Sequence, residues 1–412
     1  MRITTTYKEM QTALQVVLAT VNDSNLDVAS KNLVFWVKRE DSETRLRVVS
    51  SNVYATTYTA ISADVSFDKE DKETEYFVQL QAKAVTEIMK ALSSLSKTVI
   101  TKIEFNVLER EVILAIYEDA KEKEEADSGS YANITKFKLP RIPIKPTMIS
   151  QITSSDLVSE AVEIDRNEIM YYLDAILPMF SKDGMDNANT RIYVGAEQIY
   201  AVPLYCAVIL KNTLKDKGFY DFTLKNSIAK FIKTFISYED KIKFAKKLVS
   251  DGVYKITLAN SVSKAIITVK DLEGAFNIEK FEGKPNNGIV VSKLYMSDVL
   301  KRLALSEDTV NVEIVISEGT GSMIIECNEL VQRVPVQMVK GSGTFAFSIR
   351  PSILSSITMN HWKNAKEAQD ILAFYVANNE NGGVELCIMD ATKMWATKIK
   401  KLVLNKRDFQ WN

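Results

Sequence analysis

One pattern of apolar and polar positions recurs along the chain: a short lead-in strand, an amphipathic helix, then three alternating strands joined by short turns. In the first copy, residues 3–6 lead into a helix that begins at Tyr7. Its apolar residues keep the spacing of one helical face, and they are Met10, Leu14, Val17, Leu18 and Val21. Alternation then predicts three strands, at residues 33–38, 45–50 and 53–61.

The same order of elements predicts six such repeats, grouped in pairs. The helices of the five later repeats carry apolar stripes that include Leu92, Leu173, Ile232, Leu300 and Leu354. A proline-marked linker and a polar linker separate the pairs, at residues 140–146 and 282–287. We therefore expect three tandem domains, at residues 1–147, 148–284 and 285–412.

This order predicts an α+β protein in which each domain contains two strand-helix-strands repeats. The length of 412 residues fits roughly two to four domains. Hydrophobic residues at 46% and charged residues at 25% are typical of globular proteins. A non-enzymatic structural or assembly protein built from tandem sheet domains would have the same pattern, so the pattern alone leaves the function open.

Catalytic chemistry is sparse in this sequence. His361 is the single histidine, which excludes zinc sites built from several histidines and argues against a histidine-dependent triad. The fourteen glycines form neither a dinucleotide-binding nor a phosphate-loop pattern. The acidic run at residues 118–127 has the carboxylates of a metal cage, but interrupting lysines and the small polar residues that follow favour a solvated loop. We therefore expect no enzymatic activity, no cofactor and no metal.

The cysteines and the hydropathy indicate the compartment. Cys206, Cys327 and Cys387 are odd in number and lie in apolar, strand-like sequence, as buried thiols in a reducing cytoplasm do. No segment offers the roughly 18 uninterrupted apolar residues that a membrane span requires. We expect a cytoplasmic protein without a membrane partner.

In the order of its segments the chain resembles the bacterial sliding clamp, the beta subunit of the replicative DNA polymerase, from MRITTTYKEMQTALQVVLATV to MWATKIKKL. A phage-encoded version of that clamp fits the same pattern. The resemblance implies the DNA-clamp fold, with helices lining a central channel, sheets outside, and a homodimer closed head to tail into a ring. It also implies a processivity factor that encircles duplex DNA of any sequence, tethers the replicative DNA polymerase and meets a clamp loader, in the bacterial cytoplasm or a phage-infected cell.

The formal net charge is -1, so any DNA-binding surface has to be a local concentration of basic residues. The helical segments are together net basic, and on most of them lysines lie opposite the core stripe. The third helix instead presents Tyr171 and Asp174 there. If the helices line a channel, the candidate phosphate contacts are Lys8, Lys83, Lys90, Lys97, Lys230, Lys233, Lys301 and Arg302. The alternative is that these residues only solvate the helices.

The resemblance also implies a groove for short peptides from the polymerase and the loader, between the second and third domains. Its two sides would be Val202, Leu204, Tyr205 and Ala207 on one and Ile399, Leu402 and Val403 on the other. The alternative is that these are ordinary core residues of strands. The chain departs from the family here, because AVPLYCAVI lacks the Asp-Gly-His-Arg-Leu stretch and residues 404–412 extend beyond the usual end. The peptide preference is therefore expected to differ.

Overall fold

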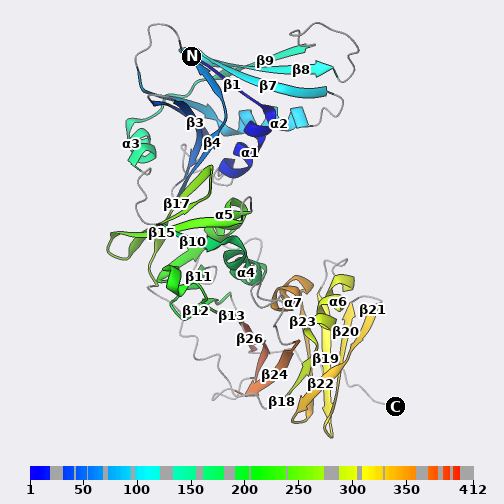
Figure 1. The fold of residues 1–412 in the computed structure, drawn as a ribbon. Helices are drawn as coiled ribbons and strands as arrows, with labels where there is room; N and C mark the ends of the chain where they lie inside the picture. Colours follow the sequence, from blue (N-terminus) through cyan, green and yellow to red (C-terminus); the bar gives the residue numbers. More distant parts are fainter. Residues whose placement is uncertain are drawn as a thin grey trace. The chain divides into compact units, whose positions relative to one another are not determined.

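A computed structural model shows the predicted α+β class, with seven α-helices and many antiparallel strands in the part of the chain that it describes (Figure 1). It describes residues 1–18, 31–40, 43–52, 54–67, 73–93, 98–120, 133–154, 161–180, 191–203, 206–237, 240–272, 287–303, 309–327, 330–358, 370–378, 384–389 and 393–399. The chain divides into two compact units. Unit 1 contains Met1–Glu163, Thr234–Val249 and Tyr254–Val269, and unit 2 contains Ile164–Lys233, Ser250–Val253 and Lys270–Asn412.

Unit 1 is formed by the N-terminal part of the chain together with one later group of strands. Its helices are α1 (Tyr7–Val17), α2 (Ala82–Ser93) and α3 (Pro146–Ser154). Its early strands are β1 (Arg2–Thr5), β2 (Asn32–Glu40), β3 (Glu43–Ser51), β4 (Ala55–Ile61), β5 (Asp64–Ser66), β6 (Glu75–Gln81), β7 (Thr98–Val107), β8 (Glu111–Ala120) and β9 (Asn133–Pro140). The later strands that fall mainly in this unit are β15 (Lys241–Ser250), β16 (Val253–Ala259) and β17 (Ser263–Lys270).

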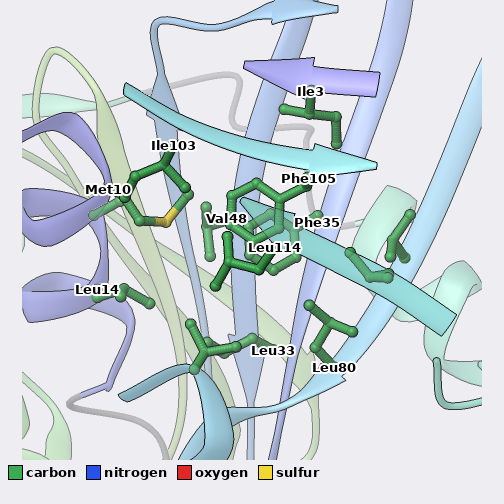
Figure 2. Packing of buried hydrophobic residues seen from close by; sticks show 14 of the residues in the cluster. Ile3, Met10, Leu14, Leu33, Phe35, Val48, Leu80, Ile103, Phe105 and Leu114 are labelled. Carbon is green, nitrogen blue, oxygen red and sulfur yellow. The ribbon is translucent and has the colours of Figure 1, made fainter. Parts of the chain in front are cut away.

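The core of unit 1 lies where the apolar face of α1 meets two sheets. The Thr6 hydroxyl accepts a hydrogen bond from the Glu9 amide at 3.2 Å, which caps the start of α1. Met10 then reaches from α1 into a buried cluster, and the rings of Phe35 and Phe105 stand 4.9 Å apart within it (Figure 2). Three apolar residues that the helical period predicts for the buried face of α1, Met10, Leu14 and Val17, are therefore core residues.

Helix α3 was not expected from the sequence, which predicts a linker at residues 140–146 and no helix between that linker and the helix of the third repeat. Ile152 and Met148 of α3 are buried against the opposite face of the β2–β4 sheet, beside Trp36 and Tyr58. The Tyr58 hydroxyl donates a hydrogen bond to the Ile152 carbonyl at 2.9 Å. The helix has only two buried apolar side chains among the residues of its cluster, and so its apolar period is too short to recognise in the sequence.

Unit 2 contains the remaining helices and strands, apart from short segments of α5 and β10 that fall in unit 1. Its α-helices are α4 (Arg166–Ile176), α5 (Asn226–Ile236), α6 (Lys293–Leu303) and α7 (Pro351–Thr358). Its strands before residue 300 are β10 (Val162–Asp165), β11 (Arg191–Val194), β12 (Gln198–Ala201), β13 (Cys206–Lys211), β14 (Phe222–Lys225) and β18 (Asn287–Val291). The later strands are β19 (Val310–Ser317), β20 (Thr320–Cys327), β21 (Leu330–Val334), β22 (Val336–Lys340), β23 (Gly343–Ile349), β24 (Leu372–Asn378), β25 (Val384–Met389) and β26 (Lys393–Ile399).

The two repeats of each pair interlock by exchanging their lead-in strands. Strand β6, which leads the second repeat, pairs with β2 of the first, and β1 pairs with β7 in return. Strands β14 and β23 pair in the same way with β11 and β19. Since each repeat lacks one strand of its own sheet, a single repeat leaves an apolar sheet edge unpaired. This is the structural reason why the repeats come in pairs.

Strands also pair between the pairs of repeats, always through the third strand of a repeat. Strand β4 pairs antiparallel with β17, from Thr59↔Ser263 to Ala55↔Ile267, within unit 1. Strand β13 pairs antiparallel with β26, from Cys206↔Thr397 to Leu210↔Lys393, within unit 2. Two third strands remain, β9 and β21, and each stands at the end of its sheet in the described part of the chain.

One predicted strand is divided in two. Alternation over residues 332–338 predicts a single strand, whereas the structure has β21 and β22 on either side of Pro335. Strand β21 pairs with β20, and β22 pairs with β18 of the other sheet. A proline has no amide hydrogen to donate to a ladder, and here it stands where the chain passes from one sheet to the next.

Candidate functional site

The helices of unit 1 present the predicted basic residues on their exposed faces. On α1, Lys8 is exposed, while Met10 and Leu14 on the other face are buried. On α2, Lys83 and Lys90 are exposed opposite the buried Val85. These lysines therefore point away from the core, as the helical period predicts.

Two details of α2 qualify that picture. The Lys83 ammonium lies 3.9 Å from the Glu87 carboxylate, one helical turn away, and both side chains are more than two-thirds exposed. Such a pair is weak, because water screens it well. Lys97, the last predicted contact of this helix, lies outside the described residues.

Helix α5, in the expected domain at residues 148–284, carries two more of the predicted lysines. Ile228, Ile232 and Phe235 form its buried face, and Lys230 is exposed. The Lys233 ammonium lies 2.5 Å from a carboxylate oxygen of Asp174 on α4, and its side chain is 42% exposed. Lys233 is thus already in an ion pair before any phosphate approaches.

Helix α6 exposes Lys301 and Arg302 next to each other near its C-terminal end. The Lys301 ammonium donates a hydrogen bond to Asp298 at 2.9 Å, and this contact holds the pKa of the Asp298 carboxyl below its ordinary value. The Arg302 guanidinium donates a longer hydrogen bond, of 3.5 Å, to the Gln332 side chain. Basic residues at this end of a helix also interact favourably with the helix dipole.

Helix α4 corrects one prediction. The helical period places Tyr171 on the outer face, but the structure buries it, and its ring contacts that of Tyr172 at a centroid distance of 5.7 Å. Asp174 of the same helix is partly exposed, as predicted. The prediction for Tyr171 is wrong because α4 packs against α7 as well as against its own sheet, so a second face is covered.

The residues predicted for one side of a peptide groove lie partly in a core. Val202 and Ala207 are 7% and 0% exposed, in a cluster with Tyr193, Tyr200 and Tyr375. The rings of Tyr193 and Tyr200 stack with centroids 5.1 Å apart. The side chains of Val202 and Ala207 thus have the burial of ordinary core residues and are not themselves exposed to a ligand.

The backbone places two strands that carry predicted groove residues side by side. Strand β13 pairs with β26, so Ala207 lies opposite Ala396, three residues before Ile399. The other predicted groove residues, Leu204, Tyr205, Leu402 and Val403, lie outside the described residues. Leu272, which the sequence argument did not select, packs partly buried against the same cluster. It lies two residues after the end of β17, outside any apolar period that would have marked it as a core residue.

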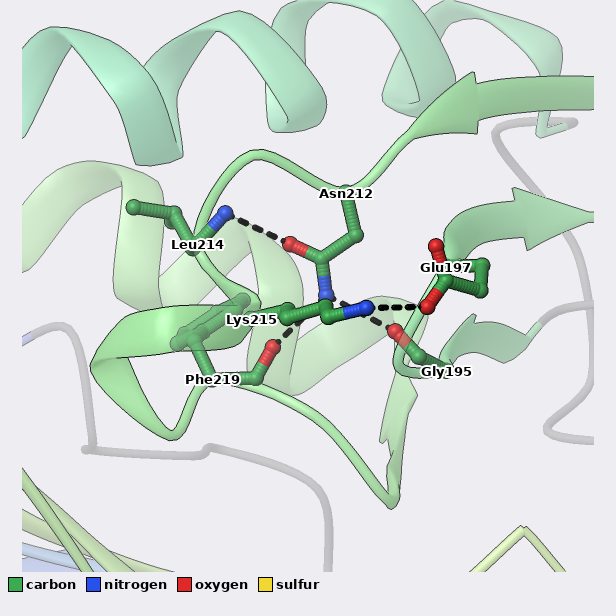
Figure 3. Close-up of polar contacts among 6 residues, drawn as sticks. All are labelled: Gly195, Glu197, Asn212, Leu214, Lys215 and Phe219. Atoms are coloured by element: carbon green, nitrogen blue, oxygen red, sulfur yellow. Dashed lines mark hydrogen bonds and ion pairs between the residues drawn. The ribbon is translucent and has the colours of Figure 1, made fainter.

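A polar network holds the loops beside this cluster (Figure 3). The side-chain amide of the buried Asn212 donates to the carbonyls of Gly195 and Phe219, at 2.7 and 2.9 Å, and its oxygen accepts from the Leu214 amide at 2.8 Å. On the surface, Lys215 pairs with Glu197 and lowers the pKa of that carboxyl. The Asn212 bonds satisfy buried backbone groups, and so this residue positions two loops rather than binding a ligand.

The structure adds little to the chemistry that the composition left open. Within the described residues no three histidine, cysteine or acidic side chains are grouped so that they could hold a metal ion. Cys327 and Cys387 are free thiols and buried, as predicted, and the side chain of Cys206 is not described. None of the described helices is both long and apolar enough to cross a membrane. His361 and most of the acidic run lie outside the described residues.

Comparison with known proteins shows a likeness in structure alone. No family model and no curated protein matches the sequence. The fold matches the DNA polymerase III subunit beta of Borrelia burgdorferi, with 15% identity, a TM-score of 0.66, and 97% of this chain and 99% of that chain covered. The sliding clamps of Caulobacter crescentus and Bacillus subtilis match with TM-scores of 0.64 and 0.63, at 13% and 12% identity. They cover the same 97% of this chain and 99% and 98% of their own, so the chain has the clamp fold over nearly its whole length.

Proposed function

We propose that this chain is a DNA polymerase processivity factor, a ring-shaped sliding clamp that encircles duplex DNA and tethers a replicative polymerase. The observation that carries the proposal is the clamp fold over 97% of the chain. The exposed basic residues on α1, α2, α5 and α6 support it, since a sequence-independent DNA contact is made by positive charge on phosphates. The three domains at 1–147, 148–284 and 285–412, the clamp loader as a partner and a cytoplasmic location belong to the same proposal.

The pairing of third strands predicts how the ring closes. Strand β4 of the first domain pairs with β17 of the second, and β13 of the second pairs with β26 of the third. By the same rule β21 of the third domain has β9 of a first domain as its partner. Within one chain each has a neighbour on one side only, in the described residues, so the missing partner is supplied by another copy.

The side chains at these two edges fit such a contact. Leu330 and Val331 of β21 are 42% and 59% exposed, and Ile134 of β9 is 49% exposed. Apolar side chains on an unpaired edge strand favour strand pairing. The contact joins different surfaces of two copies, which is a head-to-tail interface, and two chains of three domains would close it with six domains around the hole.

A closed ring explains processivity without strong DNA binding. The ring cannot leave circular duplex DNA unless an interface opens, whereas the individual phosphate contacts stay weak enough to slide. The function therefore needs only a stable ring and a positively charged inner surface. No step of it requires a catalytic residue.

Two measurements on the purified chain test the proposal. Light scattering at micromolar concentration should give the mass of a dimer. After loading onto nicked circular DNA, the protein should remain on the circle through gel filtration and be lost when a restriction enzyme linearises it. A persistent monomer, an open polymer, or equal loss from circular and linear DNA would contradict the ring.

A further inference from the structure

Three of the predicted DNA-contacting lysines form ion pairs with carboxylates that also lie on α-helices. These pairs are Lys83 with Glu87 on α2, Lys233 of α5 with Asp174 of α4, and Lys301 with Asp298 on α6. Each of the three proposed domains thus contains at least one such pair among its described residues. This repetition is independent of sequence identity between the domains, and it falls on the surface that the proposed function assigns to DNA.

The pairs differ in how tightly the carboxylate holds its lysine. The separation between ammonium and carboxylate is 2.5 Å for Lys233 and Asp174, and 2.9 Å for Lys301 and Asp298. It is 3.9 Å for Lys83 and Glu87. Asp174 is the least exposed of the three acids, at 30%, while Asp298 and Glu87 are 62% and 67% exposed. Asp174 is therefore the carboxylate that water screens least.

We propose that Asp174, Asp298 and Glu87 compete with DNA phosphates for these lysines, and that this competition keeps the inner surface weakly binding so that the ring slides. The inference rests on the proposed clamp function. A phosphate that approaches Lys233 must displace Asp174, and it is also repelled by that charge. Because the carboxylate lies well within a Debye length of its lysine, about 8 Å at physiological salt, the pair presents almost no net charge to DNA.

As a consequence, fewer lysines on this surface can neutralise phosphates than the sequence contains. Exposed ion pairs contribute little to protein stability, because water screens them, so these three are dispensable for folding. They have a larger effect on the affinity for DNA, because a lysine that is paired with a carboxylate neutralises no phosphate and so releases no counterion from DNA. Their removal should therefore change DNA binding and leave the fold unchanged.

The test compares the double variant Asp174→Asn/Asp298→Asn with the wild-type chain. Binding of a short fluorescein-labelled DNA duplex is measured by anisotropy over a series of NaCl concentrations. We expect tighter binding at low salt, by about five-fold per carboxylate, as for charges 4 Å apart in water. The plot of log affinity against log salt should also steepen, by about 0.9 for each additional phosphate that a lysine neutralises. Loaded rings should diffuse more slowly along DNA. Glu87→Gln should add a smaller effect, since that pair is the most open.

The matched control is Glu163→Gln/Glu197→Gln. It removes the same number of carboxylates from ion pairs, with Lys241 and Lys215, that lie outside the α-helices. We expect no change in DNA affinity for this control. In the variant Asp174→Asn/Lys233→Gln the increase in affinity from Asp174→Asn should disappear, which isolates the pair. Circular dichroism and the dimer mass establish that every variant folds.

The outcomes separate the inference from the function on which it rests. If the wild-type chain binds duplex and Asp174→Asn/Asp298→Asn binds no better, the competition does not exist. If the affinity of the control rises as much, only total charge matters and the inference is again overturned. If the wild-type chain forms no ring and does not bind duplex at low salt, the proposed function itself fails.

Discussion

At the scale of single residues, the exposed lysines differ in how available they are to a phosphate. Lys8 stands on the exposed face of α1, whereas Lys233 and Lys301 each have a carboxylate within hydrogen-bonding distance. A count of lysines therefore overstates the positive charge that the proposed DNA ligand would meet. Neutralising substitutions measure the contribution of each lysine more cleanly than charge reversal. A glutamate at position 233 would face Asp174, and a glutamate at position 301 would face Asp298, so each reversal would also add repulsion between two acids.

Replacing Lys90, Lys230, Lys233 and Lys301 by glutamine should weaken DNA binding and processive synthesis without unfolding the chain. All four point away from the buried stripes of their helices. The slope of log affinity against log salt should become shallower by about 0.9 for each phosphate that is no longer neutralised. The variant Lys215→Gln/Lys241→Gln, which removes exposed lysines outside the α-helices, serves as the control. Unchanged DNA affinity in the folded quadruple variant would mean that these lysines only solvate the helices.

A second residue-scale prediction concerns Glu313 on β19. Burial raises the pKa of its carboxyl, and the nearby charge of Glu326 raises it further. A carboxyl with a raised pKa in the folded state destabilises the fold once it ionises, so stability should fall as the pH rises through that pKa. Glu313→Gln should therefore raise the melting temperature at neutral pH. The difference from the wild-type chain should shrink below the ordinary glutamate pKa of 4.5. A melting temperature that is lowered at neutral pH would contradict the argument.

At the scale of elements, the paired third strands decide which segments are structural and which remain available. Strands β4, β13, β17 and β26 are paired within the chain, from residues more than 180 positions apart. Strands β9 and β21 each end a sheet in the part of the chain that the structure describes. An apolar edge strand invites association, and natural proteins cover it or charge it. We expect these two edges to be covered in the ring.

Leu330→Lys/Val331→Lys should therefore convert the dimer to a monomer. Lysine on an edge strand opposes strand pairing, because the contact would bury its charge. Light scattering at a series of concentrations measures the mass. The matched control is Leu248→Lys/Val249→Lys on β15, where the same two residue types are 57% and 53% exposed on a strand that the proposed contact does not use. A dimer that persists in the β21 variant would place the interface elsewhere.

At the scale of the whole molecule, the fold separates three tasks on one chain. The helices present basic residues, the two unpaired sheet edges would join one copy to the next in the proposed ring, and the surface near β13 and β26 is where the resemblance implies partner peptides. Since the ring would hold DNA by topology, none of these tasks depends on strong DNA affinity. A defect in partner binding should therefore leave the mass of the ring unchanged.

This separation is tested by Leu204→Ser/Leu402→Ser, at two positions predicted from the sequence for the groove. The double variant should lose binding of a polymerase-derived peptide, because a few apolar anchors dominate such interfaces. Its dimer mass and its retention on circular DNA should stay as in the wild-type chain. Full peptide affinity in the folded variant would place the partner site elsewhere. Deleting residues 405–412 should strengthen peptide binding if the tail occupies the groove and weaken it if the tail forms a wall.

The sequence by itself determined the repeating order of helix and strands, the buried stripes such as Met10 and Leu14 on α1, and the outward lysines. These depend on periods of 3.6 and 2 residues, which are local properties of the chain. Tertiary structure decided that Tyr171 is buried, that Ile152 belongs to a helix, and that Lys233 meets Asp174. It also decided that β4 pairs with β17 and β13 with β26. Contacts between residues far apart depend on which faces pack together, and no local period contains that information.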